Sequence, residues 1–209
     1  MKNIIFPLRH MLIVGNEKCG KTKFIKDVIP LFRDEGYDID ILSESIDYTD
    51  IGFNTTNTLQ AVEKLTKYQV DMMNIYKEME LHQVNNYEEL PNPPSKKVII
   101  IDNIYSYMWD FNFRYVNSIK QSILELVRLG RAAGMFIIIT TKTAGGSVIL
   151  TEISNNISTR ILLGDYDKQQ LPLIFDDDYK KVETIEFSAD QGIIKKEIDG
   201  KTEIKTFKF

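Results

Sequence analysis

A glycine-containing stretch near the N-terminus is the strongest indication of how the chain folds: Gly15-Asn16-Glu17-Lys18-Cys19-Gly20-Lys21-Thr22. Its pattern is G-x-x-x-x-G-K-[ST], in which the glycines let the backbone curl until successive N–H groups point at phosphate oxygens. A helix that begins at the end of the stretch would add the positive end of its dipole there. We expect Lys21 to neutralise the β- and γ-phosphates and the Thr22 hydroxyl to bind Mg²⁺. The stretch therefore predicts a nucleotide-binding loop for ATP.

A strand and a helix are expected on either side of this loop. His10–Val14 is short and mostly apolar, as in a buried strand. After the loop, apolar residues recur at the spacing of one helical face, until Gly36 ends the pattern. These residues are Phe24, Ile25, Val28 and Phe32. The order strand, loop, helix favours a phosphate-binding loop over the alternative, a glycine turn that caps an ordinary helix.

The rest of the chain alternates between strand-like and helix-like segments. Strands are expected at Tyr37–Leu42, Val98–Ile101, Phe136–Thr140 and Ile161–Leu163, and helices at Thr58–Glu80 and Ser118–Arg131. Asp199-Gly200, between two alternating segments, predicts a hairpin turn. We therefore predict one α/β domain over residues 1–209, a RecA-like P-loop NTPase with a mainly parallel sheet between helices. Residues 182–209 would form a C-terminal β-hairpin extension of it.

Composition limits the classes of function. Hydrophobic residues make up 43% and charged residues 27% of the 209 residues, which is ordinary for a globular protein. No run approaches the roughly 18 apolar residues of a membrane span. The single cysteine, Cys19, rules out an internal disulfide. A net charge of -4 is unfavourable for a nucleic-acid-binding domain, which is usually basic.

A second phosphate-site element is expected where an apolar strand ends in an acid. Lys97-Val98-Ile99-Ile100-Ile101-Asp102 has this form, so we expect Asp102 to hold the water shell of Mg²⁺. Many motors of this type carry a glutamate at the next position as the base for the attacking water. This chain has Asn103 there, and an amide cannot take up a proton. We therefore expect weak or absent hydrolysis; the alternative is that another acid, such as Glu17, supplies the base.

Further segments resemble the FtsK/SpoIIIE family of P-loop motors. They are Arg131-Ala132-Ala133-Gly134, the strand Met135-Phe136-Ile137-Ile138-Ile139-Thr140-Thr141, and Asn156-Ile157-Ser158-Thr159-Arg160-Ile161. The resemblance covers about His10 to Asp167. In the family a glutamine usually follows the strand as a polar sensor, whereas this chain has Lys142. That difference adds to the expectation of weak hydrolysis.

Two short segments resemble one subgroup, the third and C-terminal ATPase domain of the type VII secretion motors EssC and EccC. They are Thr141-Lys142-Thr143-Ala144-Gly145-Gly146-Ser147 and Leu163-Gly164-Asp165. The resemblance implies a fragment of a larger, membrane-anchored protein with several ATPase domains. It would be a cytoplasmic domain of a bacterial cell-membrane protein, reaching the membrane only through the missing part. The implied partners are small helical secreted proteins with a C-terminal signal, neighbouring ATPase domains of the same motor, and the other subunits of a homo-hexamer.

Two features have both an ordinary and a functional interpretation. Aromatic residues occupy every second position directly after Asp102, at Tyr105, Tyr107, Trp109, Phe111, Phe113 and Tyr115. If the segment is extended they share one face. The ordinary interpretation is a half-buried edge strand or a loop packed on the core, and the functional one is a platform for a protein partner. Arg160 is either a trans-acting arginine that reaches a neighbour's nucleotide or an arginine in a local ion pair.

Two classes of function are consistent with these residues and with the family resemblance. The first is a nucleotide-binding ATPase domain of a type VII protein-secretion motor that contributes to the recognition and export of small helical proteins. The second is an FtsK-like, DNA-translocating ATPase of a mobile element or a division system. The acidic net charge, Asn103 and the aromatic row favour the first, and DNA is not expected as a partner.

Overall fold

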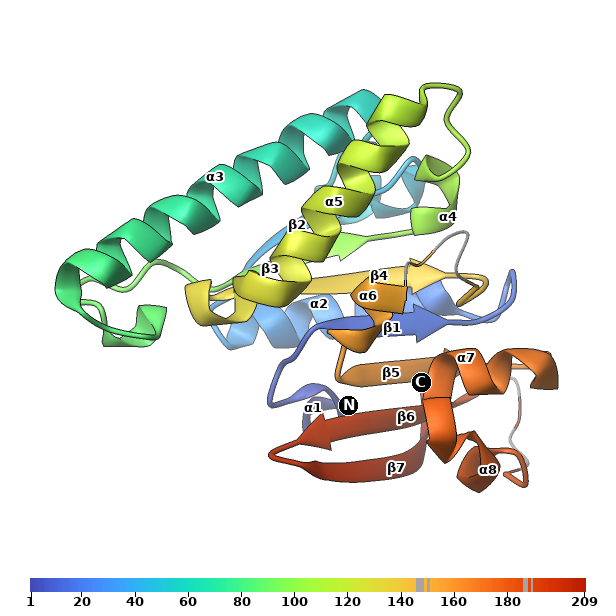
Figure 1. The fold of residues 1–209 in the computed structure, drawn as a ribbon. Coiled ribbons are helices and arrows are strands. Elements are labelled where there is room, and N and C mark those ends of the chain that lie inside the picture. Colours follow the sequence, from blue (N-terminus) through green and yellow to red (C-terminus); the bar gives the residue numbers. More distant parts are fainter. Residues whose placement is uncertain (146–148, 150, 186–187, 189) are drawn as a thin grey trace.

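The computed structural model describes residues 1–145, 149, 151–185, 188 and 190–209 (Figure 1). Gly146 and Ser147, which belong to the segment that resembles the type VII motors, lie outside the described residues.

A seven-stranded sheet forms the centre of the molecule, in the order β2-β3-β4-β1-β5-β6-β7. The first five of these strands pair in parallel, whereas β6 and β7 pair antiparallel at one edge. Their bounds are β1 Met11–Val14, β2 Asp38–Leu42, β3 Lys97–Ile101, β4 Met135–Thr141, β5 Thr159–Leu163, β6 Gln191–Ile198 and β7 Lys201–Lys208. The prediction of a mainly parallel sheet with a C-terminal hairpin is confirmed.

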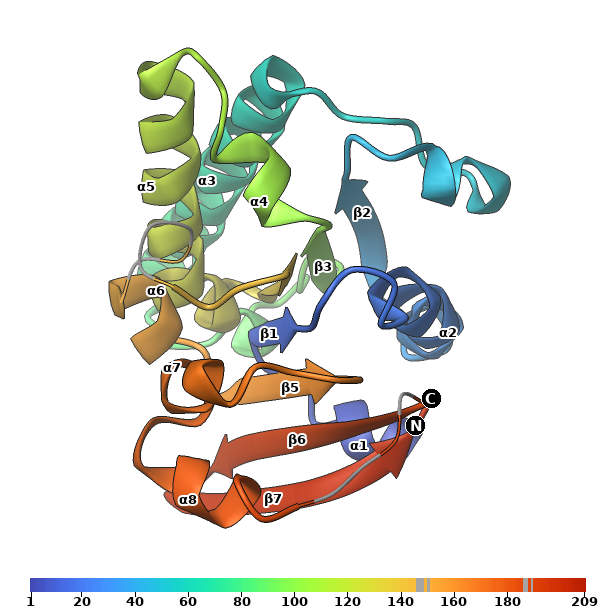
Figure 2. The same cartoon turned by 90° about the vertical axis from the view of Figure 1, so that its right-hand side faces the viewer.

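Helices cover both faces of this sheet. Figure 2, in which the sheet is seen nearly end-on, shows α3 and α5 on one side and α2 on the other. These three are α2 Lys21–Asp34, α3 Thr58–His82 and α5 Phe113–Leu129. The shorter helices are α1 Lys2–Ile5, α4 Ile104–Tyr107, α6 Thr151–Asn155, α7 Leu171–Phe175 and α8 Tyr179–Val182, and 3-10 turns include Ile46–Ile51, Tyr87–Glu89 and Gly130–Ala133.

The sheet separates two apolar cores, because successive strand side chains point to opposite faces. In β1, Leu12 and Val14 pack with α3 and α5, whereas Met11 and Ile13 pack with α2. All four residues of this strand are buried, as expected for a central parallel strand. The strand is thus fixed from both sides, which gives the loop after it a rigid support.

The aromatic row does not form a strand, so the edge-strand interpretation is wrong and the six side chains do not share one extended face. Tyr107 closes the short helix α4 and is fully buried, and its hydroxyl donates to Thr56 O at 2.7 Å. Phe113 begins α5, five residues before the predicted start at Ser118. The Asn112 side chain accepts a hydrogen bond from Arg114 N, which caps the new helix start and explains the difference.

No helix within the described ranges combines the length and the apolar character needed to cross a bilayer.

Candidate nucleotide-binding site

The predicted phosphate loop connects β1 to the N-terminus of α2, as the sequence indicated. Gly15 N donates to Thr141 O at 3.2 Å, which ties the loop to the end of β4. A Cβ atom at Gly15 would lie 2.7 Å from Leu163 O, so only glycine fits there. Gly20 caps α2 with φ +94°, a conformation that side-chain-bearing residues rarely adopt. Both glycines of the motif are therefore required by the backbone.

Lys21 is held inside the loop by the loop's own carbonyl groups. Its Nζ donates to Gly15 O at 2.6 Å and to Asn16 O at 2.8 Å. A lysine ammonium has three N–H donors, and the third faces Cys19 Sγ at 3.8 Å, a weak acceptor that a phosphate oxygen could replace. Asn16 is fixed in turn, because its Nδ2 donates to Asp165 O at 2.9 Å. The loop is thus pre-organised around a positive charge.

Asp102 lies directly after β3 and is 5% exposed. The Thr140 hydroxyl, near the end of the adjacent β4, donates to Asp102 Oδ1. The Tyr48 hydroxyl donates to Asp102 Oδ2 at 2.5 Å. A buried carboxylate needs such partners. Burying even a neutral polar group without a hydrogen bond costs roughly 2–7 kcal/mol, and an ionised carboxylate costs more. The predicted acid is therefore present at the edge of the sheet where the phosphate loop lies.

Tyr48 connects the two predicted metal ligands. It lies in the 3-10 turn Ile46–Ile51 and is 1% exposed. Its hydroxyl donates to Asp102 Oδ2, and the Thr22 side chain lies near the same hydroxyl. Burial, and next the charge of Asp102, raises the pKa of the Tyr48 hydroxyl far above its ordinary value, so the hydroxyl keeps its proton. An ion pair between Lys26 and Asp50, at 2.9 Å, ties the turn to α2.

The residues at this point suit Mg²⁺. Thr22 supplies a hydroxyl oxygen and Asp102 a carboxylate oxygen, and Mg²⁺ prefers such hard oxygen ligands together with water and phosphate oxygens. The Tyr48 hydroxyl, which donates to Asp102 and lies near Thr22, marks the space between them. A bound Mg²⁺ would supply positive charge beside the β- and γ-phosphates. The sequence did not predict that Tyr48 and Thr140 belong to the site. The segment around Tyr48 carries no motif, and Thr140 is recognisable only as a polar residue near the end of a strand.

Asn103 and Glu17, the two positions considered for a catalytic base, have other contacts. Asn103 Oδ1 accepts from Tyr105 N at 3.2 Å and thereby caps α4. The Glu17 side chain is 80% exposed and lies 3.7 Å from Lys142 Nζ. Lys142 itself lies 4.0 Å above the Tyr105 ring centroid, which places a second ammonium beside the loop. Neither Asn103 nor Glu17 is therefore held against the loop as a catalytic base.

Arg160 lies inside the fold, with an exposed fraction of 5%. Its guanidinium donates to Ser154 O at 3.0 Å, Ile174 O at 3.0 Å and Asp176 Oδ2 at 2.5 Å. These contacts agree with the interpretation of Arg160 as an arginine in a local ion pair. A trans-acting role would require all of them to break, so the geometry does not favour it.

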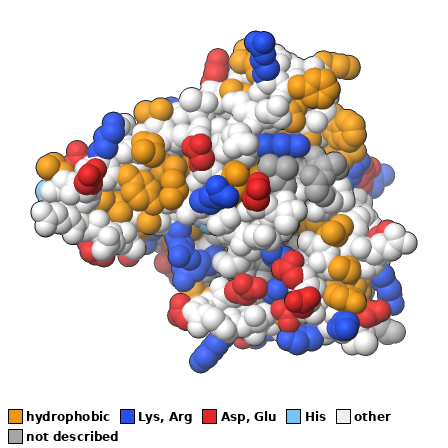
Figure 3. Space-filling view, viewed as in Figure 1, with side chains coloured by type: hydrophobic (Ala, Val, Ile, Leu, Met, Phe, Trp, Pro, Cys, Tyr) orange, Lys and Arg blue, Asp and Glu red, His pale blue; other side chains and the backbone are white. Residues whose placement is uncertain are grey.

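The exposed aromatic side chains gather where α4 passes into α5. Trp109 is 64% exposed, Phe111 101% and Phe113 78%. Hydrophobic side chains are visible over this region at the upper right of Figure 3. Tyr105 is half-buried and its ring centroid lies 5.6 Å from that of Trp109. Of the predicted aromatic row, these residues form a surface patch, whereas Tyr107 belongs to the core.

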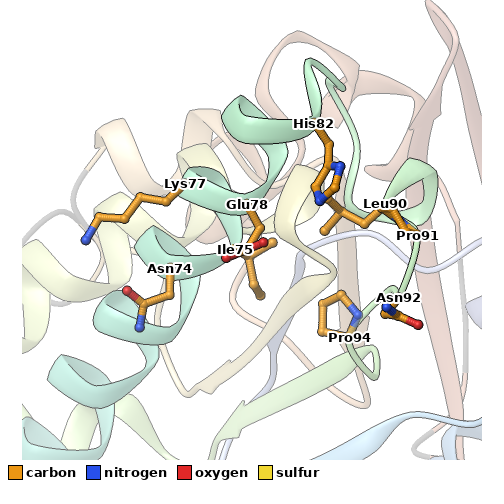
Figure 4. A pocket seen from close by; sticks show the side chains of 9 residues that line it. All are labelled: Asn74, Ile75, Lys77, Glu78, His82, Leu90, Pro91, Asn92 and Pro94. Atoms are coloured by element: carbon orange, nitrogen blue, oxygen red, sulfur yellow. The ribbon is translucent and has the colours of Figure 1, made fainter.

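A pocket of about 380 Å³ lies elsewhere, between the C-terminal half of α3 and the proline-rich segment after it (Figure 4). Ile75, His82, Leu90 and Pro94 are among its lining residues, and none of the lining residues belongs to the phosphate loop. It is therefore separate from the predicted nucleotide site.

The chain is similar to several known P-loop proteins. The Ftsk domain-containing protein YdcQ of Bacillus subtilis (strain 168) is 26% identical over 167 residues, covering 75% of this chain and 34% of YdcQ. The chain thus spans about a third of that relative. The structure of the pCW3 conjugation coupling protein TcpA, a monomer form with ATPgS, superposes with a TM-score of 0.79 at 15% identity, over 94% of this chain and 59% of TcpA.

Two solved type VII motors also share the fold. EssC (ATPases 2 and 3) from Geobacillus thermodenitrificans gives a TM-score of 0.75 at 15% identity, over 96% of this chain and 39% of EssC. The cytoplasmic domain of EccC from Thermomonospora curvata gives 0.71 at 14% identity, over 96% and 25%. The resemblance to FtsK-type and EssC/EccC ATPase domains is confirmed. Residues 5–157 match the family described as Rad17 P-loop domain, and the chain belongs to that family.

Proposed function

We propose that this chain binds Mg-ATP at Gly15–Thr22 and serves as an ATPase domain of a macromolecular translocation motor. The observation that carries the proposal is the arrangement of Lys21, Thr22 and Asp102 around the N-terminus of α2. Lys21 is fixed by loop carbonyls, and Tyr48 donates to Asp102 while lying near Thr22. This arrangement provides backbone donors, one cation and two oxygen ligands for a triphosphate with its metal.

Hydrolysis by this domain alone would be weak or absent. General-base catalysis needs a group that accepts a proton within hydrogen-bond reach of the attacking water. Asn103 cannot accept one, and its side-chain oxygen is engaged with Tyr105 N. The carboxylate of Glu17 is exposed and pairs with Lys142. Binding and release of nucleotide would then act mainly on conformation and on contacts with neighbouring ATPase domains.

The proposed cargo is polypeptide, specifically small helical secreted proteins with a C-terminal signal. The exposed patch of Trp109, Phe111 and Phe113 supports this, because aromatic side chains dominate the binding energy of protein interfaces. The patch begins at Trp109, seven residues after Asp102. A partner bound there would contact a segment that closely follows the expected metal ligand along the chain. In the full motor we expect neighbouring ATPase domains and a hexameric ring, with the membrane reached through other parts of the protein.

A second candidate is a DNA-translocating ATPase of a mobile element or division system. The similarity to the FtsK-domain protein YdcQ and to the conjugation coupling protein TcpA favours it. The net charge of -4 is unfavourable for it, since proteins that neutralise many phosphates are usually basic over the contact surface.

One experiment separates the two candidates. Fluorescence anisotropy would measure binding of the chain to a labelled small helical secretion substrate, to the same substrate without its C-terminal tail, and to a labelled DNA duplex over a series of salt concentrations. Saturable binding that requires the tail, without duplex binding, supports the secretion function. Tight duplex binding that weakens steeply with salt, without a response to the substrate, would assign the chain to the DNA motors.

A further inference from the structure

Phe209 lies against the phosphate loop although it is far from it in sequence. A Cβ atom placed on Gly20 would be 2.7 Å from Phe209 Cε2, so the ring touches the backbone of the loop itself. The Lys23 ammonium is 5.6 Å from the centre of the same ring. Figure 2 shows the C-terminus on the side of the sheet where α2 lies. An aromatic ring thus borders the first turn of the helix that receives the phosphates.

The ring is held in place by the edge hairpin and by the core beneath it. Phe209 N donates to Asp190 O at 3.2 Å, directly after the end of β7. Its ring makes an edge contact with Phe24, with centroids 6.0 Å apart, and a tilted contact with Phe207 at the same distance. Phe24 and Phe207 are buried, whereas Phe209 itself is half-buried. The ring is therefore supported from below and partly open to solvent.

The position of the ring matches the nucleoside end of a bound triphosphate. In a phosphate loop the lysine and the metal lie at the β- and γ-phosphates, while the loop backbone also cradles the α-phosphate. Here the metal end is marked by Thr22, Tyr48 and Asp102, and Asp102 follows β3. The sheet order puts β3 on one side of β1 and the β6–β7 hairpin on the other. A triphosphate whose metal-bound end lies at Asp102, and whose chain crosses the loop, would therefore have its nucleoside end near Phe209.

We propose that the Phe209 ring, with Lys23 beside it, is the platform on which the base of the bound nucleotide stacks. The inference rests on the proposed nucleotide binding and adds to it the residue that recognises the base. Lys23 is a surface side chain, with 62% exposure, that can leave the ring when a base arrives. Base–aromatic stacking is stronger than an exposed cation–π contact. The released ammonium, which also lies 3.6 Å from Asp27 Oδ2, can then turn to the phosphate next to the ribose.

The test compares a ligand with a base and a ligand without one. Isothermal titration calorimetry would measure binding of ATP and of inorganic tripolyphosphate, both with Mg²⁺, to the wild-type chain, Phe209→Leu and Phe209→Tyr. Leucine keeps apolar packing on Phe24 but has no π face, whereas tyrosine keeps the ring. Phe209→Leu should weaken ATP binding on the order of tenfold and leave tripolyphosphate affinity unchanged, while Phe209→Tyr should bind both ligands like the wild type.

Two results would overturn the platform while leaving the nucleotide site intact. Unchanged ATP affinity in Phe209→Leu would show that the base lies elsewhere. An equal loss of ATP and tripolyphosphate binding would show that the ring only supports the loop. If the wild-type chain binds neither ligand, the proposed nucleotide function itself is wrong. Thermal unfolding of both variants, recorded before titration, identifies any loss of folded protein.

Discussion

The hydroxyl of Tyr48 donates a hydrogen bond to Asp102 Oδ2 at 2.5 Å across a sequence separation of 54 residues. The Thr22 side chain lies near the same hydroxyl, so one phenol lies between the end of β3 and the start of α2. These are the two side chains expected to face Mg²⁺. Binding of the metal and its water shell would compete with the phenol for the Asp102 oxygen, because both use the same lone pairs.

Tyr48→Phe tests this competition. The free protein should lose about 1–3 kcal/mol of unfolding free energy, because the buried Asp102 oxygen loses its donor. Mg-ATP should then stabilise the variant more than it stabilises the wild type, since no phenol has to be displaced. Thermal unfolding of both proteins with and without Mg-ATP measures the two effects. Equal stabilisation by Mg-ATP in both would contradict the competition.

Asn103→Glu should raise the rate of ATP hydrolysis at least about tenfold, because a positioned general base contributes about 10²–10⁴-fold to such reactions. Asn103→Gln is the matched control, since it has the same length but cannot accept a proton. Phosphate release under saturating Mg-ATP is the measurement. Fast hydrolysis by the wild-type chain, unchanged in both variants, would show that another residue supplies the base.

Trp109→Ala and Tyr107→Ala separate the aromatic surface from the core. Trp109 is 64% exposed, so its truncation should change unfolding free energy by less than about 0.5 kcal/mol but weaken binding of the secretion substrate. Tyr107 is fully buried and bonds Thr56 O, so its truncation should cost about 3–5 kcal/mol. Chemical denaturation and substrate titration check both. A large loss of stability in Trp109→Ala would refute the proposed partner surface.

His10 makes stability depend on pH. Burial, and next the charges of Arg131 and Arg9, lowers its pKa from 6.5 to about 4, and its Nδ1 accepts a hydrogen bond from Ile137 N at 3.1 Å. Between these pH values the unfolded chain binds a proton that the folded chain does not, so stability rises with pH. The contribution, about 3 kcal/mol, is complete above pH 6.5 and is lost as pH falls toward 4.

His10→Asn keeps an acceptor for Ile137 N but does not titrate in this range. Denaturation of the wild type and the variant between pH 4 and 7 measures the difference. The variant should lack the part of the pH dependence that comes from His10. Parallel curves for the two proteins would mean that His10 has the same pKa in the folded and unfolded chain.

The strongest sequence signals were local ones, and the structure agrees with them. The phosphate loop, the strand before Asp102 and the turn at Asp199-Gly200 depend on neighbouring residues and were predictable. Tyr48 and Phe209 reach the site through the order of the strands and the hairpin, which no spacing in the sequence encodes. The edge-strand interpretation of the aromatic row is wrong for a related reason. Its alternation resembles a strand, but the Asn103 and Asn112 side chains cap helices there.

The most direct test of nucleotide binding at the phosphate loop is calorimetric titration of ATPγS with Mg²⁺ into the wild-type chain, Lys21→Ala and Lys77→Ala. Lys77 lines the separate pocket on α3 and serves as the matched control. We predict saturable binding by the wild type and by Lys77→Ala, and at least about tenfold weaker binding by Lys21→Ala, because a charged hydrogen bond contributes about 1.5–3 kcal/mol. Equal affinity in all three proteins, or no binding by the wild type, would contradict nucleotide binding at Gly15–Thr22.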